Sequence, residues 1–115
     1  KGMDVWDLLM ASFPAGTVSG APKIRAMQLI NKLEPDSRGP YSGVYGSVDL
    51  SGALNTAITI RSMIVRQHVE GGWLVQVQAG AGVVADSIPT AEYQETLNKA
   101  SAMLTALACL EHPGS

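Results

Sequence analysis

The sequence predicts an α+β fold in which an antiparallel sheet is layered with helices. Two observations support this class. Helix-type apolar spacing is confined to the two ends of the chain, and strand-type alternation fills its middle. The links between the strands are too short for crossover helices, so neighbouring strands should run antiparallel. We expect residues 1–115 to form a single domain that is a piece of a longer protein, because the chain starts at Lys1 and not at Met.

Two helices are predicted in the first third of the chain. The segment from Val5 to Met10 has a short amphipathic pattern that ends before Pro14, because a proline restricts the residue before it. Pro22 suits the first turn of a second helix, predicted over residues 22–34. The apolar stripe of that helix consists of Ala26, Met27, Ile30 and Leu33.

The middle of the chain predicts three antiparallel strands. Apolar and polar residues alternate from Val44 to Leu50, and a long β-type run extends from Leu54 to Val65. Glu70-Gly71-Gly72 predicts a hairpin turn that leads into a strand from Trp73 to Gln78.

Pro89 opens the last predicted helix, over residues 89–110. At 100° per residue, Glu92, Glu95 and Lys99 fall in one arc beside the apolar face. That face is expected to contain Tyr93, Leu97, Ala100, Leu104, Leu107 and Ala108.

Composition excludes several classes of protein. The net charge of -2 offers no basic footprint for nucleic acid, and no apolar run approaches the ~20 residues of a membrane span. Cys109 is the only cysteine, so no disulfide can form within the chain. We therefore expect a cytoplasmic protein.

Glu92-x-x-Glu95-x-x-x-Lys99 has two interpretations. Glu95 and Lys99 form a favourable i,i+4 pair, as on an ordinary solvated helix face. Alternatively, the two carboxylates are ligands for Mg²⁺, which usually takes one or two protein carboxylates together with water and an anionic substrate.

Two glycine-rich segments could contact an anion through backbone N–H groups. Gly80-Ala81-Gly82 follows a strand, but a dinucleotide loop would need a helix starting inside the glycines and a βαβ unit. The alternative to an anion contact is that these small residues form a bulge or a tight turn. Gly16-Thr17-Val18-Ser19-Gly20 is a predicted loop before a helix. Either Ser19 or Thr17 caps that helix, or backbone N–H groups and the Thr17 hydroxyl together bind an anion.

Arg61 and Tyr41 also allow two interpretations each. Arg61 interrupts an apolar strand, so its guanidinium either faces solvent or holds a carboxylate in a bidentate fork. Tyr41 at a strand start either lies at the edge of the core or contacts a ligand.

In this order, the motifs resemble the C-terminal part of the chorismate-binding enzymes, from about Asp7 to Leu107. The matching blocks are Pro14 to Met27, Arg38-Gly39-Pro40-Tyr41-Ser42-Gly43, Thr56 to Arg61, Gln78 to Ser87, and Glu92-x-x-Glu95-Thr96-x-Asn98-Lys99. Within the family, the Gly16-Thr17-Val18-Ser19-Gly20 loop looks like that of the anthranilate synthases. Aminodeoxychorismate synthases, the alternative, tend to carry Gly-Ser-Ile-Thr-Gly there.

The resemblance implies a chemistry: Mg²⁺-dependent conversion of chorismate to anthranilate and pyruvate, with ammonia from a glutamine amidotransferase partner. It implies Glu92 and Glu95 as Mg²⁺ ligands and Lys99 as a catalytic residue beside the metal-bound carboxylate. Substrate contacts would come from Thr17, Tyr41, Arg61, Gly80, Ala81 and Gly82.

The resemblance also implies that much of the enzyme is missing, because family members are about four times longer and carry further site residues upstream. We therefore expect the chain alone to be inactive. The alternative to an enzyme fragment is a non-catalytic truncated module that only binds an anion or a partner subunit. Apolar surface left uncovered should favour association into homo-oligomers.

Overall fold

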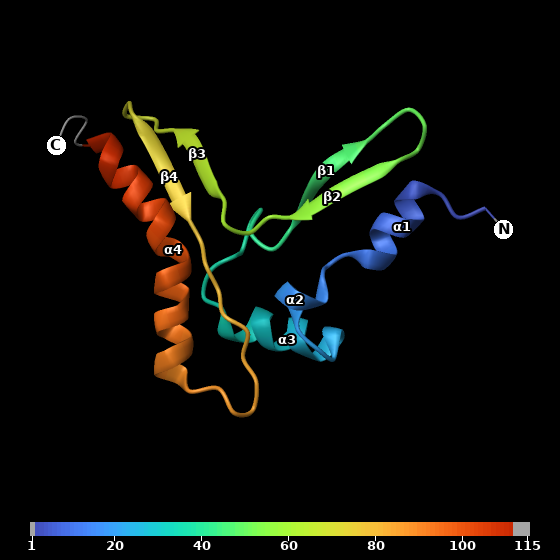
Figure 1. Ribbon diagram of the computed structural model, residues 1–115, viewed down its shortest axis with the longest axis horizontal. Coiled ribbons are helices and arrows are strands. Elements are labelled where there is room, and N and C mark those ends of the chain that lie inside the picture. The colour runs from blue at the N-terminus through green and yellow to red at the C-terminus, as the bar shows by residue number, and fades with distance from the viewer. Residues whose placement is uncertain (1, 112–115) are drawn as a thin grey trace. The chain divides into compact units, whose positions relative to one another are not determined.

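A computed structural model describes residues 2–111 and divides the chain into two compact units, with the division between Thr59 and Ile60 (Figure 1). Each unit combines antiparallel strands with helices, which confirms the predicted α+β class. The single-domain organisation stays a prediction.

Three helices open the first unit: α1 (Val5–Ser12), α2 (Gly16–Ser19) and α3 (Lys23–Leu33). A capping box starts α1, because the Asp4 carboxylate accepts from the Asp7 N–H while the Asp7 carboxylate accepts from the Asp4 N–H. The predicted helices over residues 5–10 and 22–34 are confirmed.

The loop predicted over residues 16–20 is wrong, because α2 forms one helical turn there. The Ala15 carbonyl accepts hydrogen bonds from the backbone N–H groups of Val18 and Ser19 and, at 3.1 Å, from the Ser19 hydroxyl. Gly20 ends the turn with a φ of 89°, a conformation that glycine adopts at little cost. The expected capping of α3 by Thr17 or Ser19 is also absent, since Pro22 occupies the N-cap and no side chain caps it.

The strands form two antiparallel hairpins. In the first unit, β1 (Val44–Val48) pairs with β2 (Leu54–Ile58), and Gly46 faces Thr56. In the second unit, β3 (Met63–Gln67) pairs with β4 (Trp73–Val77), and Val65 faces Val75.

The single long strand predicted from Leu54 to Val65 is therefore wrong, and so is the three-stranded sheet. The run breaks between Ile58 and Met63, where Arg61 has a φ of 55°. This left-handed conformation does not belong to a strand and is uncommon for a residue with a side chain. Apolar composition alone did not reveal the break.

The second unit ends with α4 (Pro89–Glu111), which packs against β4 (Figure 1). Its less exposed side contains Met103, which is the buried apolar residue of the described chain, together with Glu92, Thr96, Lys99, Ala100 and Leu107.

The predicted apolar face of α4 is wrong in part. Ala100 and Leu107 are half-buried as expected, but Tyr93, Leu97, Leu104 and Ala108 are exposed, and Tyr93 retains 65% of its surface. Hydrophobic spacing identifies an apolar stripe, whereas contact with β4 decides which side is covered. As a result, Glu92 and Lys99 lie on the less exposed side of α4 and are half-buried, whereas the sequence predicts them beside that side. Across residues 2–111, no helix combines the length and the apolar character that a bilayer crossing requires.

Candidate functional site

The predicted site residues fall into two groups, one in each unit. Thr17 and Tyr41 belong to the first unit. The second unit contains the remaining seven, which are Arg61, Gly80, Ala81, Gly82, Glu92, Glu95 and Lys99.

In the first group, Thr17 is exposed on α2 and Tyr41 is half-buried in the turn that precedes β1. Between their segments lies Arg38, whose guanidinium carbon is 6.0 Å from the centre of the Tyr41 ring, at the outer limit of a cation–π contact. Arg38, Val18, Tyr41 and Ser42 also line an open cavity of about 540 Å³. A cavity of this size falls in the range of small-molecule sites.

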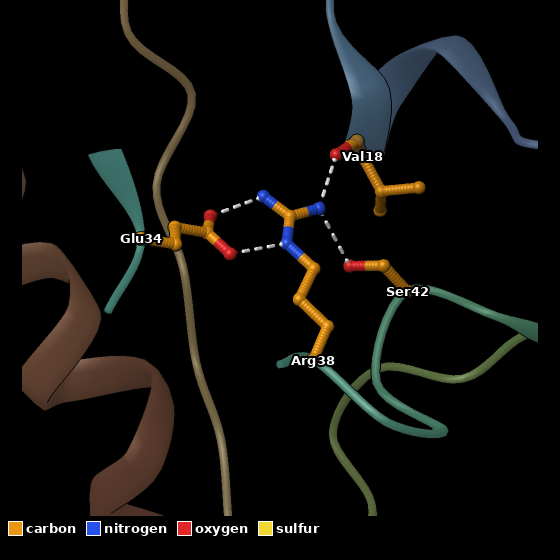
Figure 2. Close-up of polar contacts among 4 residues, drawn as sticks. All are labelled: Val18, Glu34, Arg38 and Ser42. Atoms are coloured by element: carbon orange, nitrogen blue, oxygen red, sulfur yellow. Dashed lines mark hydrogen bonds and ion pairs between the residues drawn. The ribbon is translucent and has the colours of Figure 1, made fainter. Parts of the chain in front are cut away.

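Arg38 makes four side-chain hydrogen bonds (Figure 2). Its Nε and Nη2 donate to the two carboxylate oxygens of Glu34 at 2.8 and 2.5 Å, which is a bidentate fork. Its Nη1 donates to the Val18 carbonyl at 2.8 Å and to the Ser42 hydroxyl at 3.1 Å. The hydrogen bond from Arg38 holds the pKa of the Glu34 carboxyl below its ordinary value, and the same bond raises the pKa of Arg38.

In the second group, Gly80-Ala81-Gly82, which we call the glycine loop, follows β4 without regular structure, and α4 begins only at Pro89. No helix starts inside the glycines, so the segment lacks the geometry that a dinucleotide loop requires. Within residues 2–111, the N–H groups of Gly80, Ala81 and Gly82 donate to no other protein group. These donors are therefore available to an anion.

Lys99 connects this loop to the carboxylates of α4. Its ammonium group donates to the Gly80 carbonyl at 3.1 Å and forms an ion pair with Glu95. The hydrogen bond and charge of Lys99 lower the pKa of Glu95, with smaller contributions from Glu92 and from the charge of Arg61. Lys99 and, more weakly, Arg61 therefore both act electrostatically on Glu95 within the second unit.

Glu92 has a different partner. The Ser87 hydroxyl donates to a Glu92 carboxylate oxygen at 2.8 Å and accepts from the Val84 N–H at 3.0 Å. This chain of hydrogen bonds connects the segment after the glycine loop to the first turn of α4, and it orients the carboxylate.

The donor set fits Mg²⁺ in its chemistry. Glu92 and Glu95 are one helical turn apart, and carboxylate oxygens are the ligands that Mg²⁺ prefers. Among residues 2–111, no cluster of three or more acidic, histidine or cysteine side chains forms, so the pair would need water or other groups to complete six-fold coordination. Lys99 already pairs with Glu95 and would lie beside the ion.

Sequence reasoning missed the roles of four residues: Glu34, Arg38, Ser42 and Ser87. The i,i+4 spacing of Glu34 and Arg38 is a signal that could have indicated their ion pair. Ser42 and Ser87 carry no comparable signal, because their partners depend on how turns fold back.

Comparison with known proteins identifies the family of the chain. The family model described as chorismate binding enzyme matches residues 1–105. Proteins named anthranilate synthase component 1 are similar to the chain: that of Synechocystis sp. is 65% identical over 91% of this chain and 21% of its own length. That of Streptomyces coelicolor is 54% identical over 93% of this chain and 20% of its own length. The chain thus spans about a fifth of the length of these curated relatives. With the family model matching most of its residues, the chain belongs to the chorismate binding enzyme family.

Proposed function

We propose that this chain forms part of the chorismate site of an anthranilate synthase large component. The observation that carries the proposal is the contact of Lys99 with both Glu95 and the Gly80 carbonyl, since it joins the glycine loop to the acidic pair. Identities of 65% and 54% with proteins named anthranilate synthase component 1 favour this reaction over that of other family members.

The proposed substrate is a dianion, and the chain offers two kinds of partner for its carboxylates. In the second unit, Arg61 with its planar fork would hold a substrate carboxylate. In the first unit, the Tyr41 hydroxyl is a separate proposed substrate contact. The N–H groups of Gly80 to Gly82 and the Thr17 hydroxyl would add hydrogen bonds to the substrate. Such donors restrict chorismate to one orientation in which ammonia reaches the ring.

The ring carboxylate would lie at Glu92 and Glu95, which we propose as Mg²⁺ ligands. When bound, Mg²⁺ would act as a Lewis acid that draws electron density from the ring. Ser87 would keep Glu92 oriented, and Lys99 would keep Glu95 ionised while placing a positive charge beside the substrate carboxylate.

The reaction then balances as follows. A nitrogen–carbon bond forms between ammonia and the ring while the ring hydroxyl leaves as water. Loss of a ring proton and of the enolpyruvyl side chain as pyruvate makes the ring aromatic. The name component 1 of the relatives supports a second component, which we propose to be a glutamine amidotransferase that supplies ammonia in the cytoplasm.

A segment exchange tests the proposal. In the Synechocystis relative, the 105 matching residues are replaced by those of this chain, and we call this protein the chimera. With chorismate, ammonium and Mg²⁺, we expect anthranilate, detected by its fluorescence, at a rate within about tenfold of the relative. Arg61→Asn, which suits the left-handed backbone, and Glu95→Gln should each abolish most activity, whereas Arg66→Asn on β3 should not. A chimera that melts like the relative yet forms no anthranilate would contradict the proposal.

A further inference from the structure

Arg38 lies beside two of the proposed substrate contacts without being free to bind substrate itself. Four hydrogen bonds to protein groups use most of the five donors of its guanidinium. Glu34 neutralises its charge through a bidentate fork, and the side chain is only 24% exposed. An arginine in this state is a poor anion receptor, so its role must come from what it connects.

Arg38 connects the residues that directly follow Thr17 and Tyr41. Its Nη1 atom donates both to the carbonyl of Val18 and to the hydroxyl of Ser42 (Figure 2). The Val18 carbonyl is in the last turn of α2, where carbonyl groups have no partner within the helix. One planar group therefore holds the end of α2 and the turn before β1 against each other.

The Ser42 turn needs such support. Ser42 has a φ of 65°, which is unfavourable for a residue with a side chain, and it is 9% exposed. Its backbone N–H donates to the Thr59 carbonyl at 3.0 Å, so the turn is also tied to the end of β2. The side-chain bond from Arg38 fixes the Ser42 hydroxyl and thereby restrains the turn that contains Tyr41.

We propose that Arg38 is a positioning residue for the chorismate site. Held in place by Glu34, its guanidinium keeps the Thr17 and Tyr41 segments in a fixed relative arrangement, so that both hydroxyl groups meet the substrate together. The inference rests on the proposed function, because Thr17 and Tyr41 are substrate contacts only under that proposal.

The test uses the chimera and four variants. Arg38→Lys keeps the charge but cannot reproduce the planar fork together with two further bonds. Ser42→Gly suits the left-handed backbone and removes only the bond on the Tyr41 side. Glu34→Gln weakens the fork, and Arg25→Lys on the exposed surface of α3 is the matched control.

Hydrogen exchange measured by mass spectrometry reports how firmly the Thr17 and Tyr41 segments are held, and it does not depend on enzyme activity. Arg38→Lys should speed exchange in peptides that cover residues 15–20 and residues 40–44, whereas Ser42→Gly should affect only the second peptide. Arg25→Lys should change neither. Unchanged exchange in both peptides of Arg38→Lys would overturn the inference.

Steady-state kinetics distinguish positioning from general destabilisation. Because the two contacts bind substrate in the ground state, Arg38→Lys should raise the KM for chorismate about tenfold and change kcat less than about threefold. Ser42→Gly and Glu34→Gln should raise KM by about threefold.

Should Arg38→Lys fail to fold, the Ser42→Gly variant decides, and an unchanged KM for chorismate in that variant would overturn the inference. If the unmodified chimera is active and Arg38→Lys has the kinetics of Arg25→Lys, the inference fails while the proposed function stands; a folded, inactive chimera contradicts the proposed function instead.

Discussion

The ammonium group of Lys99 donates a hydrogen bond to the carbonyl oxygen of Gly80 over 3.1 Å, across 19 residues of sequence. The same ammonium group pairs with Glu95. A single side chain on α4 therefore holds the glycine loop beside an acidic residue of the same helix. Lys99 therefore connects Gly80 and Glu95, which the sequence predicts only as separate candidate residues.

Lys99→Met should have opposite effects on two measurements. Removing the ammonium group relieves its repulsion of a cation at Glu95, so we expect Mg²⁺ to bind the chimera several-fold more tightly in calorimetric titration. Turnover of chorismate should fall by about tenfold or more, because the glycine loop loses a charge-assisted hydrogen bond. Lys32→Met on α3 should alter neither value. Weaker Mg²⁺ binding in Lys99→Met would contradict the competition between Lys99 and the metal.

Ser87→Ala should weaken Mg²⁺ binding by about tenfold, because residues that orient metal ligands commonly have effects of this size. The variant leaves the Glu92 carboxylate without the hydroxyl that orients it. Ser101→Ala is the matched control, since the Ser101 hydroxyl donates only to the Asn98 carbonyl within α4. Equal Mg²⁺ affinities in the two variants would show that Ser87 does not act on a metal site.

Gly46→Ala should destabilise the first unit by about 2 kcal/mol, the usual cost of forcing extra volume into a packed position. A Cβ atom at Gly46 would lie 2.0 Å from the Asn55 carbonyl oxygen, inside the β1–β2 hairpin. A Cβ atom at Gly16 meets nothing within 4 Å, so Gly16→Ala should leave stability nearly unchanged. Thermal unfolding followed by circular dichroism checks both variants, and equal midpoints would refute the predicted clash.

The Glu34–Arg38 pair should contribute to stability only above acidic pH. Arg38 lowers the pKa of Glu34 in the folded state below its ordinary value of 4.5, so the stabilisation is present above that value. It is lost as the pH falls through the lowered pKa of the folded state. Since Glu34 is 37% exposed, solvent screening limits the effect to at most about 1 kcal/mol. The stability difference between the wild-type chain and Glu34→Gln should therefore shrink from pH 7 to pH 3. A constant difference would contradict this linkage.

The 115-residue chain alone should form no measurable anthranilate from chorismate, ammonium and Mg²⁺. It spans about a fifth of the length of its relatives, and among residues 2–111 no cluster of three or more potential metal-ligating side chains forms. Large apolar side chains are exposed, including Trp6 and Trp73 at 59% and 71%. Light scattering after size exclusion should accordingly detect association that increases with protein concentration. A monomeric, active chain would overturn both expectations.

Local patterns predicted the elements that depend on local interactions. Residues 5–10, 22–34 and 89–110 were recognised as helices, and the strands around Val44 and Trp73 were recognised from alternation. The break at Arg61 is not visible in the sequence, because a run of β-forming residues does not reveal a residue with positive φ. The turn of α2 is not visible either, because glycines at both of its ends indicate a loop.

The residues proposed for the site came from the resemblance of the motif blocks to a known family, because spacing alone also fitted an ordinary solvated helix face for Glu92, Glu95 and Lys99. Only the tertiary structure showed that Lys99 contacts Gly80, that Ser87 orients Glu92, and that Arg38 joins Val18 to Ser42. It also placed Glu92 and Lys99 on the less exposed side of α4, whereas the sequence predicts them beside that side. The physical reason is that propensity and periodicity act over a few residues, whereas a hydrogen bond between distant segments depends on how turns bring them together.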